Sequence, residues 1–325
     1  MTATSKDLVR FLTIDDTAEG QRLDNFLFCE LKGVPKSHVQ RIIRGGEVRL
    51  NKKRCKGTDR LNVGDVVRIP PVRTAASADT SAKPIPPRVF DIVYEDDALL
   101  VINKPSGVAV HGGSGVSFGV IEQLRRARPQ ARYLELVHRL DKDTSGLLMI
   151  AKKRSALVKL HEMIRLNVPQ KSYLALGVGA WQAETRRVTL PLVKYVGAQG
   201  EKMVRVGEDG QSAHTVFDVL QRFSGSLLHQ IGLSDLSLLR ATLKTGRTHQ
   251  IRVHMQSQHC PIAGDERYGD YQANKRLQKI GLKRMFLHAA ELVLPHPLSG
   301  EPLNLNAPLP MDLQQLLLVL AHGKE

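Results

Sequence analysis

The sequence has little of several features that mark specialised classes of protein. Its 325 residues contain three cysteines, at positions 29, 55 and 260, which are too few and too scattered for a disulfide framework. No run of 18 or more apolar residues occurs, so we expect no transmembrane helix. The first 16 residues lack the apolar stretch of a signal peptide, so we expect a protein of the reducing cytoplasm.

Sequence motifs for nucleotides and metal ions are also missing. No G-x-x-x-x-G-K-[ST] loop occurs, and no G-x-G-x-x-G follows a predicted strand. His249, His254, His259 and Cys260 lie close together in sequence, but neither C-x-x-C nor H-E-x-x-H is present. We therefore predict neither a metal site nor a cofactor.

Acidic residues are in the minority, and the excess of positive charge is uneven. Lys and Arg number 47 against 32 Asp and Glu, a net charge of +15. Residues 36–60 hold nine cations against two acids, a net +7: Lys36, Arg41, Arg44, Arg49, Lys52, Lys53, Arg54, Lys56 and Arg60. Such an excess indicates a polyanionic partner, either nucleic acid or an anionic membrane surface. A charged face that only contacts solvent is the alternative.

A small folded unit is predicted around this basic segment. A capping box of Ser37 and Gln40 opens a helix that Gly45-Gly46 ends. Strands are predicted over 47–50 and 65–69, with a basic turn after the first. A helix followed by a basic hairpin can bind phosphates. The cations expected to do so are Arg41, Arg44, Lys52, Lys53 and Arg54.

A change of composition divides the chain into two domains. A flexible Pro/Ala/Ser-rich linker is predicted at 73–87, between a domain of residues 1–72 and one of residues 88–325. The larger domain has strand-like segments at 91–94, 99–103, 146–151, 172–176, 237–244 and 290–294. Helices are predicted after Ser155 and at the C-terminus. Because strands and helices do not alternate strictly, we predict an α+β fold.

Residues 138–148, HRLDKDTSGLL, gather opposite charges directly before an apolar strand. Asp143 precedes the turn residues Thr144-Ser145-Gly146, so we interpret it as shaping the loop by accepting local backbone hydrogen bonds. Asp141 has no such duty. Beside Arg139 or another cation its ionised form is favoured, which suits a nucleophile or a base. A structural ion pair, a helix cap and a metal ligand remain alternatives.

A second cluster of cations is GRTHQIRVH, residues 246–254. If this segment is helical, His249 and Arg252 share one face at i,i+3. If it is extended, Ile251 and Val253 alternate inward and Arg252 faces the other way. Periodicity does not decide between the two. In either case, arginines and histidines lie near strand ends, where functional sites are often built.

Four segments in this order resemble the motifs of the RluA family of pseudouridine synthases: NKPSG at 103–107, HRLDKDTSG at 138–146, KSYLAL at 171–176 and GRTHQIRVH. Residues 21–70 are similar to the S-four-like RNA-binding domain that many such enzymes carry in front. The resemblance extends from about residue 18 to residue 310. It implies a catalytic domain built on a mixed, largely antiparallel β-sheet flanked by helices.

The resemblance also implies roles for individual residues. Asp141 would be the catalytic residue, Tyr173 would pack on the target uracil and Arg252 would pair with Asp141. Arg139 would lie at the flipped-out base. Further residues expected to bind the RNA are His138, Arg247, His249 and Lys104.

The function implied by this resemblance is the isomerisation of specific uridines to pseudouridine in 23S (large-subunit) ribosomal RNA, by base flipping, by a monomer. A pure RNA-binding or ribosome-assembly factor would also explain the charge, but not the match at Asp141, Tyr173 and Arg252. A metal-dependent nuclease using Asp141 and Asp143 would cleave RNA and lose activity with a chelator. Transfer RNA and small-subunit RNA are the competing substrates.

Overall fold

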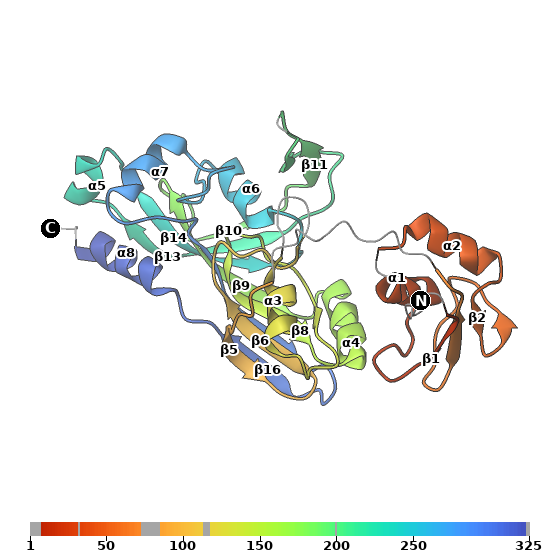
Figure 1. Ribbon diagram of the computed structural model, residues 1–325. Coiled ribbons are helices and arrows are strands. Elements are labelled where there is room, and N and C mark those ends of the chain that lie inside the picture. Colours follow the sequence, from red (N-terminus) through yellow and green to blue (C-terminus); the bar gives the residue numbers. More distant parts are fainter. Residues whose placement is uncertain (1–7, 32, 73–84, 113–117, 199, 323–325) are drawn as a thin grey trace. The chain divides into compact units, whose positions relative to one another are not determined.

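The computed structural model describes residues 8–31, 33–72, 85–112, 118–198 and 200–322 (Figure 1). The chain forms two compact units: residues 1–84 with 130–133, and residues 85–129 with 134–325. Most of the predicted linker, residues 73–84, lies outside the described residues. In the described part of the chain, no helix has the length and apolar character needed to cross a membrane.

The N-terminal unit has one four-stranded antiparallel sheet and two helices. Its sheet order is β1-β4-β2-β3. The elements are β1 (Arg10–Thr13), α1 (Leu23–Glu30), α2 (Lys36–Arg44), β2 (Arg49–Leu50), β3 (Lys53–Arg54) and β4 (Val66–Ile69). Buried aliphatic side chains from α1, α2 and β4 form a core of their own, which includes Leu27, Ile42 and Val67.

Helix α2 has the predicted amphipathic pattern but not the predicted cap. Its apolar side is buried, its two arginines are exposed, and Gly46 follows it with a φ of +71°. The helix begins at Lys36 with Pro35 as N-cap, and no side chain caps it. The predicted capping box of Ser37 and Gln40 is therefore wrong. Pro35 fixes φ at the entrance, so the helix starts early and Ser37 lies inside its first turn.

The basic hairpin is shorter and tighter than predicted. Strands β2 and β3 have two residues each, and Leu50 pairs with Lys53. Asn51 and Lys52 form the turn with φ values of 49° and 64°, both in the left-handed region. Two such residues match the twist of a two-residue hairpin turn, although lysine rarely takes this conformation. The turn therefore fixes an exposed ammonium group at the hairpin tip.

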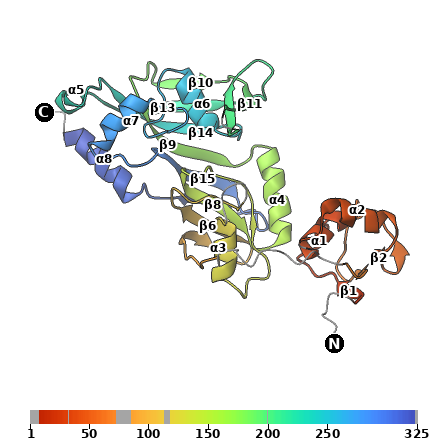
Figure 2. The same cartoon turned by 45° about the horizontal axis from the view of Figure 1, so that its top comes forward.

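The second unit is built on a ten-stranded sheet (Figure 2). Its order is β10-β13-β14-β9-β15-β8-β6-β5, with β16 on β15 and β7 on β8, and only the β15–β8 pair is parallel. The strands are β5 (Asp91–Glu95), β6 (Leu99–Lys104), β7 (Glu135–Leu136), β8 (Ser145–Ala151), β9 (Gln170–Val178), β10 (Thr185–Val188), β13 (Thr215–Phe223), β14 (Leu236–Leu243), β15 (Leu287–Pro295) and β16 (Pro302–Asn306). The predicted α+β class, with a mixed and largely antiparallel sheet, is confirmed.

Five of the six helices described in this unit contribute to two separate clusters of buried side chains that also contain residues of the sheet. The helices are α3 (Val120–Ala127), α4 (Arg154–Arg165), α5 (Ser226–Gln230), α6 (Gln250–Ser257), α7 (Tyr271–Gln278) and α8 (Met311–His322). One cluster joins α3 and α6 to the sheet, and the other joins α5, α7 and α8. Strand β9 contributes Ala175 to the first and Leu176 to the second, as alternation along a strand requires. A two-stranded hairpin of β11 (Leu192–Val196) and β12 (Lys202–Val206) stands beside the sheet.

Candidate active site

A cavity of about 560 Å³ surrounds Asp141 in the second unit. Five segments line it: the loop before β8, the end of α4 with the turn after it, the start of β9, the segment from β14 into α6, and the first residue of β15. Five cations line it, and Asp141 is the one acid among the lining residues. These cations are Arg139, Arg165, Lys171, Arg247 and Arg252. The cavity therefore combines a single carboxylate with a strongly positive wall.

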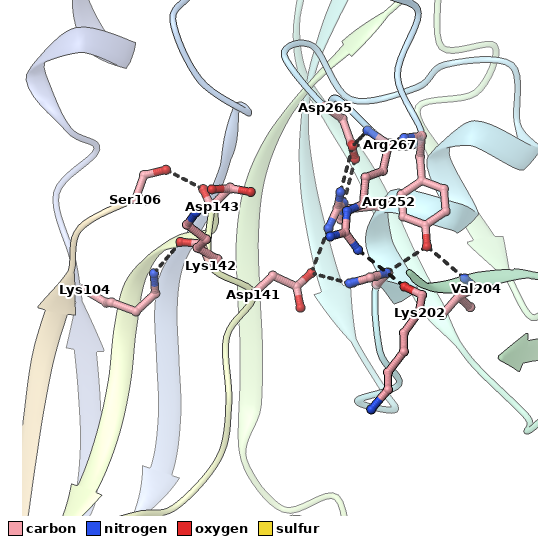
Figure 3. Close-up of polar contacts among 12 residues, drawn as sticks. Lys104, Ser106, Asp141, Lys142, Asp143, Lys202, Val204, Arg252, Asp265 and Arg267 are labelled. Atoms are coloured by element: carbon pink, nitrogen blue, oxygen red, sulfur yellow. Dashed lines mark hydrogen bonds and ion pairs between the residues drawn. The ribbon is translucent and has the colours of Figure 1, made fainter. Parts of the chain in front are cut away.

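The cation in contact with Asp141 comes from α6 and not from its own loop. Arg252 Nη1 lies 3.3 Å from Asp141 Oδ2 (Figure 3). The Asp141 side chain is 20% exposed, whereas that of Arg252 is 6% exposed. Arg139 lies exposed on the cavity wall. The charge pair thus joins two segments that are 111 residues apart in sequence.

The NKPSG segment holds the Asp141 loop in place (Figure 3). Lys104 is fully buried, and its ammonium donates to the carbonyls of Pro105 (2.9 Å), Val108 (2.9 Å) and Lys142 (3.0 Å). Gly107 N also donates to the Lys142 carbonyl, at 2.9 Å. Burial lowers the pKa of Lys104 to about 7, but three carbonyl acceptors favour its protonated form. The expectation that Lys104 contacts RNA is wrong, because its charge is used inside the protein.

Asp143 contributes to the same loop through its backbone. Its carbonyl accepts a hydrogen bond from Ser106 Oγ at 2.7 Å. Within the described residues its exposed carboxylate accepts none, so the predicted loop-shaping hydrogen bonds of this side chain are wrong. The turn is closed instead by Thr144 N, which donates to the Asp141 carbonyl at 3.2 Å. The carbonyls of the loop therefore accept the hydrogen bonds that hold it, and neither carboxylate is used for this purpose.

Gly146 fixes this loop to the sheet. Here β8 pairs in parallel with β15, Ala289 lying opposite Gly146, which has a φ of +108°. A Cβ atom on Gly146 would lie 2.2 Å from the Ala289 carbonyl oxygen. Only glycine fits both the conformation and the close approach. The Asp141 loop therefore ends at a fixed point in the core.

Helix α6 supplies Arg252 and confirms the helical alternative for residues 250–254, whereas residues 246–249 precede the helix. Asp265 binds the Arg252 guanidinium at two points, 2.7 Å to Nε and 2.8 Å to Nη2, and the Asp265 side chain is fully buried. Burial alone would lower the pKa of Arg252, but the hydrogen bonds and charge of Asp265, with those of Asp141, raise it. Arg252 is therefore a fixed, permanently charged donor to Asp141.

Tyr173 and His138 line the cavity as neutral groups. Burial and the charge of Asp141 raise the pKa of Tyr173, so this side chain stays a phenol. Burial, together with the charge of Lys171, lowers the pKa of His138 to about 4. Its Nε2 accepts a hydrogen bond from Met149 N at 3.1 Å. His138 is thus directed towards β8 and provides no positive charge.

The remaining expected site residues fall into two groups. Arg247 and His249 line the cavity, and His249 Nε2 lies 3.8 Å from Asp141 Oδ2. The basic residues Arg41, Arg44, Lys52, Lys53 and Arg54 are exposed in the N-terminal unit. That unit has a separate cavity of about 520 Å³, whose lining includes Arg44 and Arg54.

Several residues of this site were not predicted from the sequence. Arg165 and Asn167 lie at the end of α4 and in the turn after it. They were not predicted as site residues, because the apolar pattern of this helix indicates only a helix packed on the core. Lys171 stands two residues before Tyr173 and could have been noticed. Asp265 lies in a glycine-flanked loop, GDERYGD, whose acids and tyrosine could have marked it as a candidate functional loop. In the described part of the chain, no three His, Cys, Asp or Glu side chains meet as metal ligands.

Comparison with known protein families matches both units. The family described as RNA pseudouridylate synthase matches residues 98–257, and the S4 domain family matches residues 21–67. The first match includes Asp141, Tyr173 and Arg252.

Curated relatives match along nearly the whole chain. Ribosomal large subunit pseudouridine synthase C of Salmonella typhimurium is 50% identical, over 99% of this chain and 99% of that protein. The proteins of the same name from Haemophilus influenzae and Escherichia coli are 48% and 49% identical. The former match covers 97% of this chain and 96% of that protein, and the latter 99% of each.

Solved structures match about 70% of the chain. Human RNA Pseudouridylate Synthase Domain Containing 4 is 29% identical with a TM-score of 0.57, over 71% of this chain and 93% of that chain. Human RNA Pseudouridylate Synthase Domain Containing 1 is 26% identical with a TM-score of 0.57, over 70% of this chain and 86% of that chain.

Proposed function

Because this chain belongs to the RNA pseudouridylate synthase family, we propose that it converts uridine to pseudouridine in 23S ribosomal RNA with Asp141 as the catalytic carboxylate. The observation that carries this proposal is the cavity with one carboxylate among five cations. Its volume of about 560 Å³ is in the range of small-molecule sites, which run from about 300 to 1,000 Å³. A flipped-out nucleotide, with one base and its phosphates, suits both the size and the charge.

The reaction needs one well-placed carboxylate. The bond from uracil N1 to ribose C1′ breaks, the base turns, C5 bonds to C1′, and the C5 proton is released while N1 gains one. Atoms and electrons balance within the substrate and water, so we propose that no cofactor takes part. Asp141 can attack the sugar, attack the base or remove a sugar proton. Arg252 keeps the carboxylate oriented in each case.

Other residues of the cavity are proposed to bind the target nucleotide. The neutral ring of Tyr173 packs on the uracil, and Arg139, exposed at the wall, lies at the flipped-out base. Arg247, Arg165 and Lys171 hold the flanking phosphates. Flipping the base costs a few kcal/mol, which phosphate contacts partly offset.

The N-terminal unit is proposed to add affinity for RNA. Its exposed cations on α2 and the β2–β3 hairpin can contact RNA phosphates. The relatives named for the large ribosomal subunit make large-subunit RNA, or an assembly intermediate of it, the proposed substrate. We further propose that the enzyme acts as a monomer in the cytoplasm.

Release of tritium from RNA labelled at uridine C5 tests this function. The wild type should release tritium from large-subunit transcripts in the presence of a chelator. Asp141→Asn should release none and should still bind RNA, measured by fluorescence anisotropy. The matched control is Asp143→Asn, which changes an exposed carboxylate of the same loop and should remain active.

Each competing function gives a different result in this assay. Activity on transfer RNA or small-subunit transcripts alone would keep the enzyme class and change the substrate. Strand cleavage that stops with chelator would indicate a nuclease. Binding without tritium release from any RNA would favour a pure assembly factor, and a fully active Asp141→Asn would remove Asp141 from the mechanism.

A further inference from the structure

His249 is held by a second residue that the motifs did not assign. It is the N-cap of α6 and has left-handed backbone angles, with φ 53° and ψ 21°. Its Nδ1 lies 2.8 Å from the hydroxyl of Tyr268, and its Nε2 lies 3.8 Å from Asp141 Oδ2. The imidazole therefore stands between a buried phenol and the carboxylate.

The contacts of the Tyr268 hydroxyl determine which hydrogen bond it accepts and which it donates. It accepts a hydrogen bond from Val204 N in β12, at 2.9 Å, because a backbone N–H can only donate. Its own proton is then free for Nδ1 of His249, which must accept it. The opposite tautomer would leave this proton without an acceptor among the described residues, in a side chain that is 3% exposed. Such an unsatisfied buried donor is unfavourable.

Acceptance at Nδ1 determines what His249 presents to Asp141. Burial lowers the pKa of His249, and Asp141 only partly opposes this, so the ring is neutral and has one N–H. With Nδ1 unprotonated, that N–H is on Nε2, the atom nearest to Asp141. A movement of less than about 1 Å would bring the two atoms within hydrogen-bond distance.

The same loop also supports the other donor to Asp141. The Tyr268 ring lies under the Arg252 guanidinium, 4.9 Å from its centroid. The amides of Arg267 and Tyr268 bind Asp265 Oδ1 at 2.9 and 3.0 Å. Tyr268 packs in a small cluster of buried residues with Val204 and Val253, which ties it to β12 and α6. Tyr268 therefore contacts both groups that face Asp141 Oδ2.

We propose that Tyr268 is a positioning residue that fixes the Nε2–H tautomer of His249 and so directs a second donor at Asp141. Both donors, Arg252 and His249, face Oδ2 of the carboxylate, which leaves Oδ1 free to reach the ribose or the base. This inference rests on the proposed function of Asp141 and extends it to a residue that does not line the cavity.

Tyr268→Phe removes only the hydroxyl and tests the proposal. We expect kcat to fall about five- to tenfold, the size of one hydrogen bond, with KM changed less than about twofold. Nitrogen-15 NMR of the wild type should show His249 protonated at Nε2, and the variant should show both tautomers. The matched control, Tyr271→Phe, removes the hydroxyl of an exposed tyrosine three residues along and should leave both readouts unchanged.

Substitution of His249 separates positioning from simple packing. A glutamine amide can place N–H near the position of Nε2, whereas an asparagine amide reaches only the position of Nδ1. We therefore expect His249→Gln to keep most of its kcat and His249→Asn to lose at least as much as Tyr268→Phe.

Three outcomes would overturn the inference: wild-type kcat in Tyr268→Phe, an Nδ1-protonated His249 in the wild type, or equal activity of His249→Gln and His249→Asn. If the wild type releases no tritium from any RNA, the proposed function fails. In that case nitrogen-15 NMR of His249 still tests whether Tyr268 fixes the Nε2–H tautomer.

Discussion

The basic segment of the N-terminal unit and the Asp141 site of the second unit carry their positive charge in opposite ways. On α2 and the β2–β3 hairpin, the arginines and lysines are exposed to solvent. Around Asp141, the main cation is a buried arginine bound at two points by a buried carboxylate. An exposed cation can move and is screened by salt, whereas a buried pair is fixed and hardly screened.

This difference suggests that the exposed cations and the buried cations have different roles in one RNA-binding enzyme. Mobile exposed cations favour affinity, because they follow a phosphate backbone and release its counterions. Fixed buried charges favour a high rate of reaction, because they hold the catalytic carboxylate in the orientation that the reaction requires. Changes in the N-terminal unit should then alter RNA binding, and changes around Arg252 should alter turnover and stability.

The largest effect is expected from Asp265→Asn, which keeps the shape of the side chain and removes its charge. Arg252 would be left buried without its main partner, and breaking a buried pair costs about 3–5 kcal/mol. Urea unfolding would measure this loss, and kcat should fall with it. Glu266→Gln, an exposed neighbour, is the matched control and should change stability by less than about 0.5 kcal/mol. Equal stability of the two variants would contradict the view that Arg252 depends on Asp265.

Mild acid should destabilise the second unit more than the N-terminal unit. Burial lowers the pKa of His138 and of His288 to about 4, so the unfolded chain binds protons that the folded one excludes. Stability from these residues is complete above about pH 6.5 and is lost as pH falls towards 4. From pH 7 to 5 the loss is about 2 kcal/mol for fully buried His288.

The single tryptophan, Trp181, is buried in the second unit, so its fluorescence follows that unit alone. Methyl NMR signals of Ile42 and Ile43 report on the N-terminal unit. A urea midpoint for Trp181 that is the same at pH 7 and pH 5 would contradict the prediction. An equal shift of both probes would mean that the acid acts on the whole chain.

A smaller effect is expected when three cations of the hairpin, Lys52, Lys53 and Arg54, are changed together to alanine. The affinity for RNA should fall about tenfold, and the slope of log K against log salt should become shallower by about 2. The value of kcat at saturating RNA should not change. The control is the triple alanine variant of Lys153, Lys159 and Lys275, which are exposed cations outside the cavity. If the control loses as much affinity, charge anywhere on the surface is sufficient.

The smallest expected effect concerns the strained turn of that hairpin. Lys52→Gly removes the cost of a left-handed lysine and should stabilise the N-terminal unit by about 0.5–1 kcal/mol. It should also weaken RNA binding slightly, because an exposed ammonium is lost. Thermal unfolding and anisotropy would measure the two changes. A variant that is less stable would indicate that the turn is not strained.

Sequence patterns predicted the strands that are apolar on at least one side. The six strand segments predicted in the second unit lie in strands between β5 and β15, except that the segment 237–244 extends one residue beyond β14. Strands β10 to β13 were missed, because charged and exposed side chains interrupt their alternation. The capping box was predicted wrongly because the conformational restriction of Pro35 outweighed it.

Only part of the candidate site could be inferred from sequence. Asp141 stood out because it had no local role, and the family resemblance brought in Arg252. Asp265 and Tyr268 could not be linked to Asp141 beforehand, since their contacts depend on how α6 packs against the sheet. Lys104 was misjudged for the converse reason. A lysine in a motif suggests a ligand, and only the fold shows that its ammonium is enclosed by three carbonyls.

The enclosure of Lys104 has a consequence for how the enzyme meets its substrate. The Asp141 loop is ordered by internal hydrogen bonds, so its conformational entropy is lost during folding and not during RNA binding. Hydrogen–deuterium exchange makes this visible. The amides of Gly107 and Thr144, which bond to the loop's own carbonyls, should exchange as slowly as those of the neighbouring strands β6 and β8. Their protection should be the same with and without RNA.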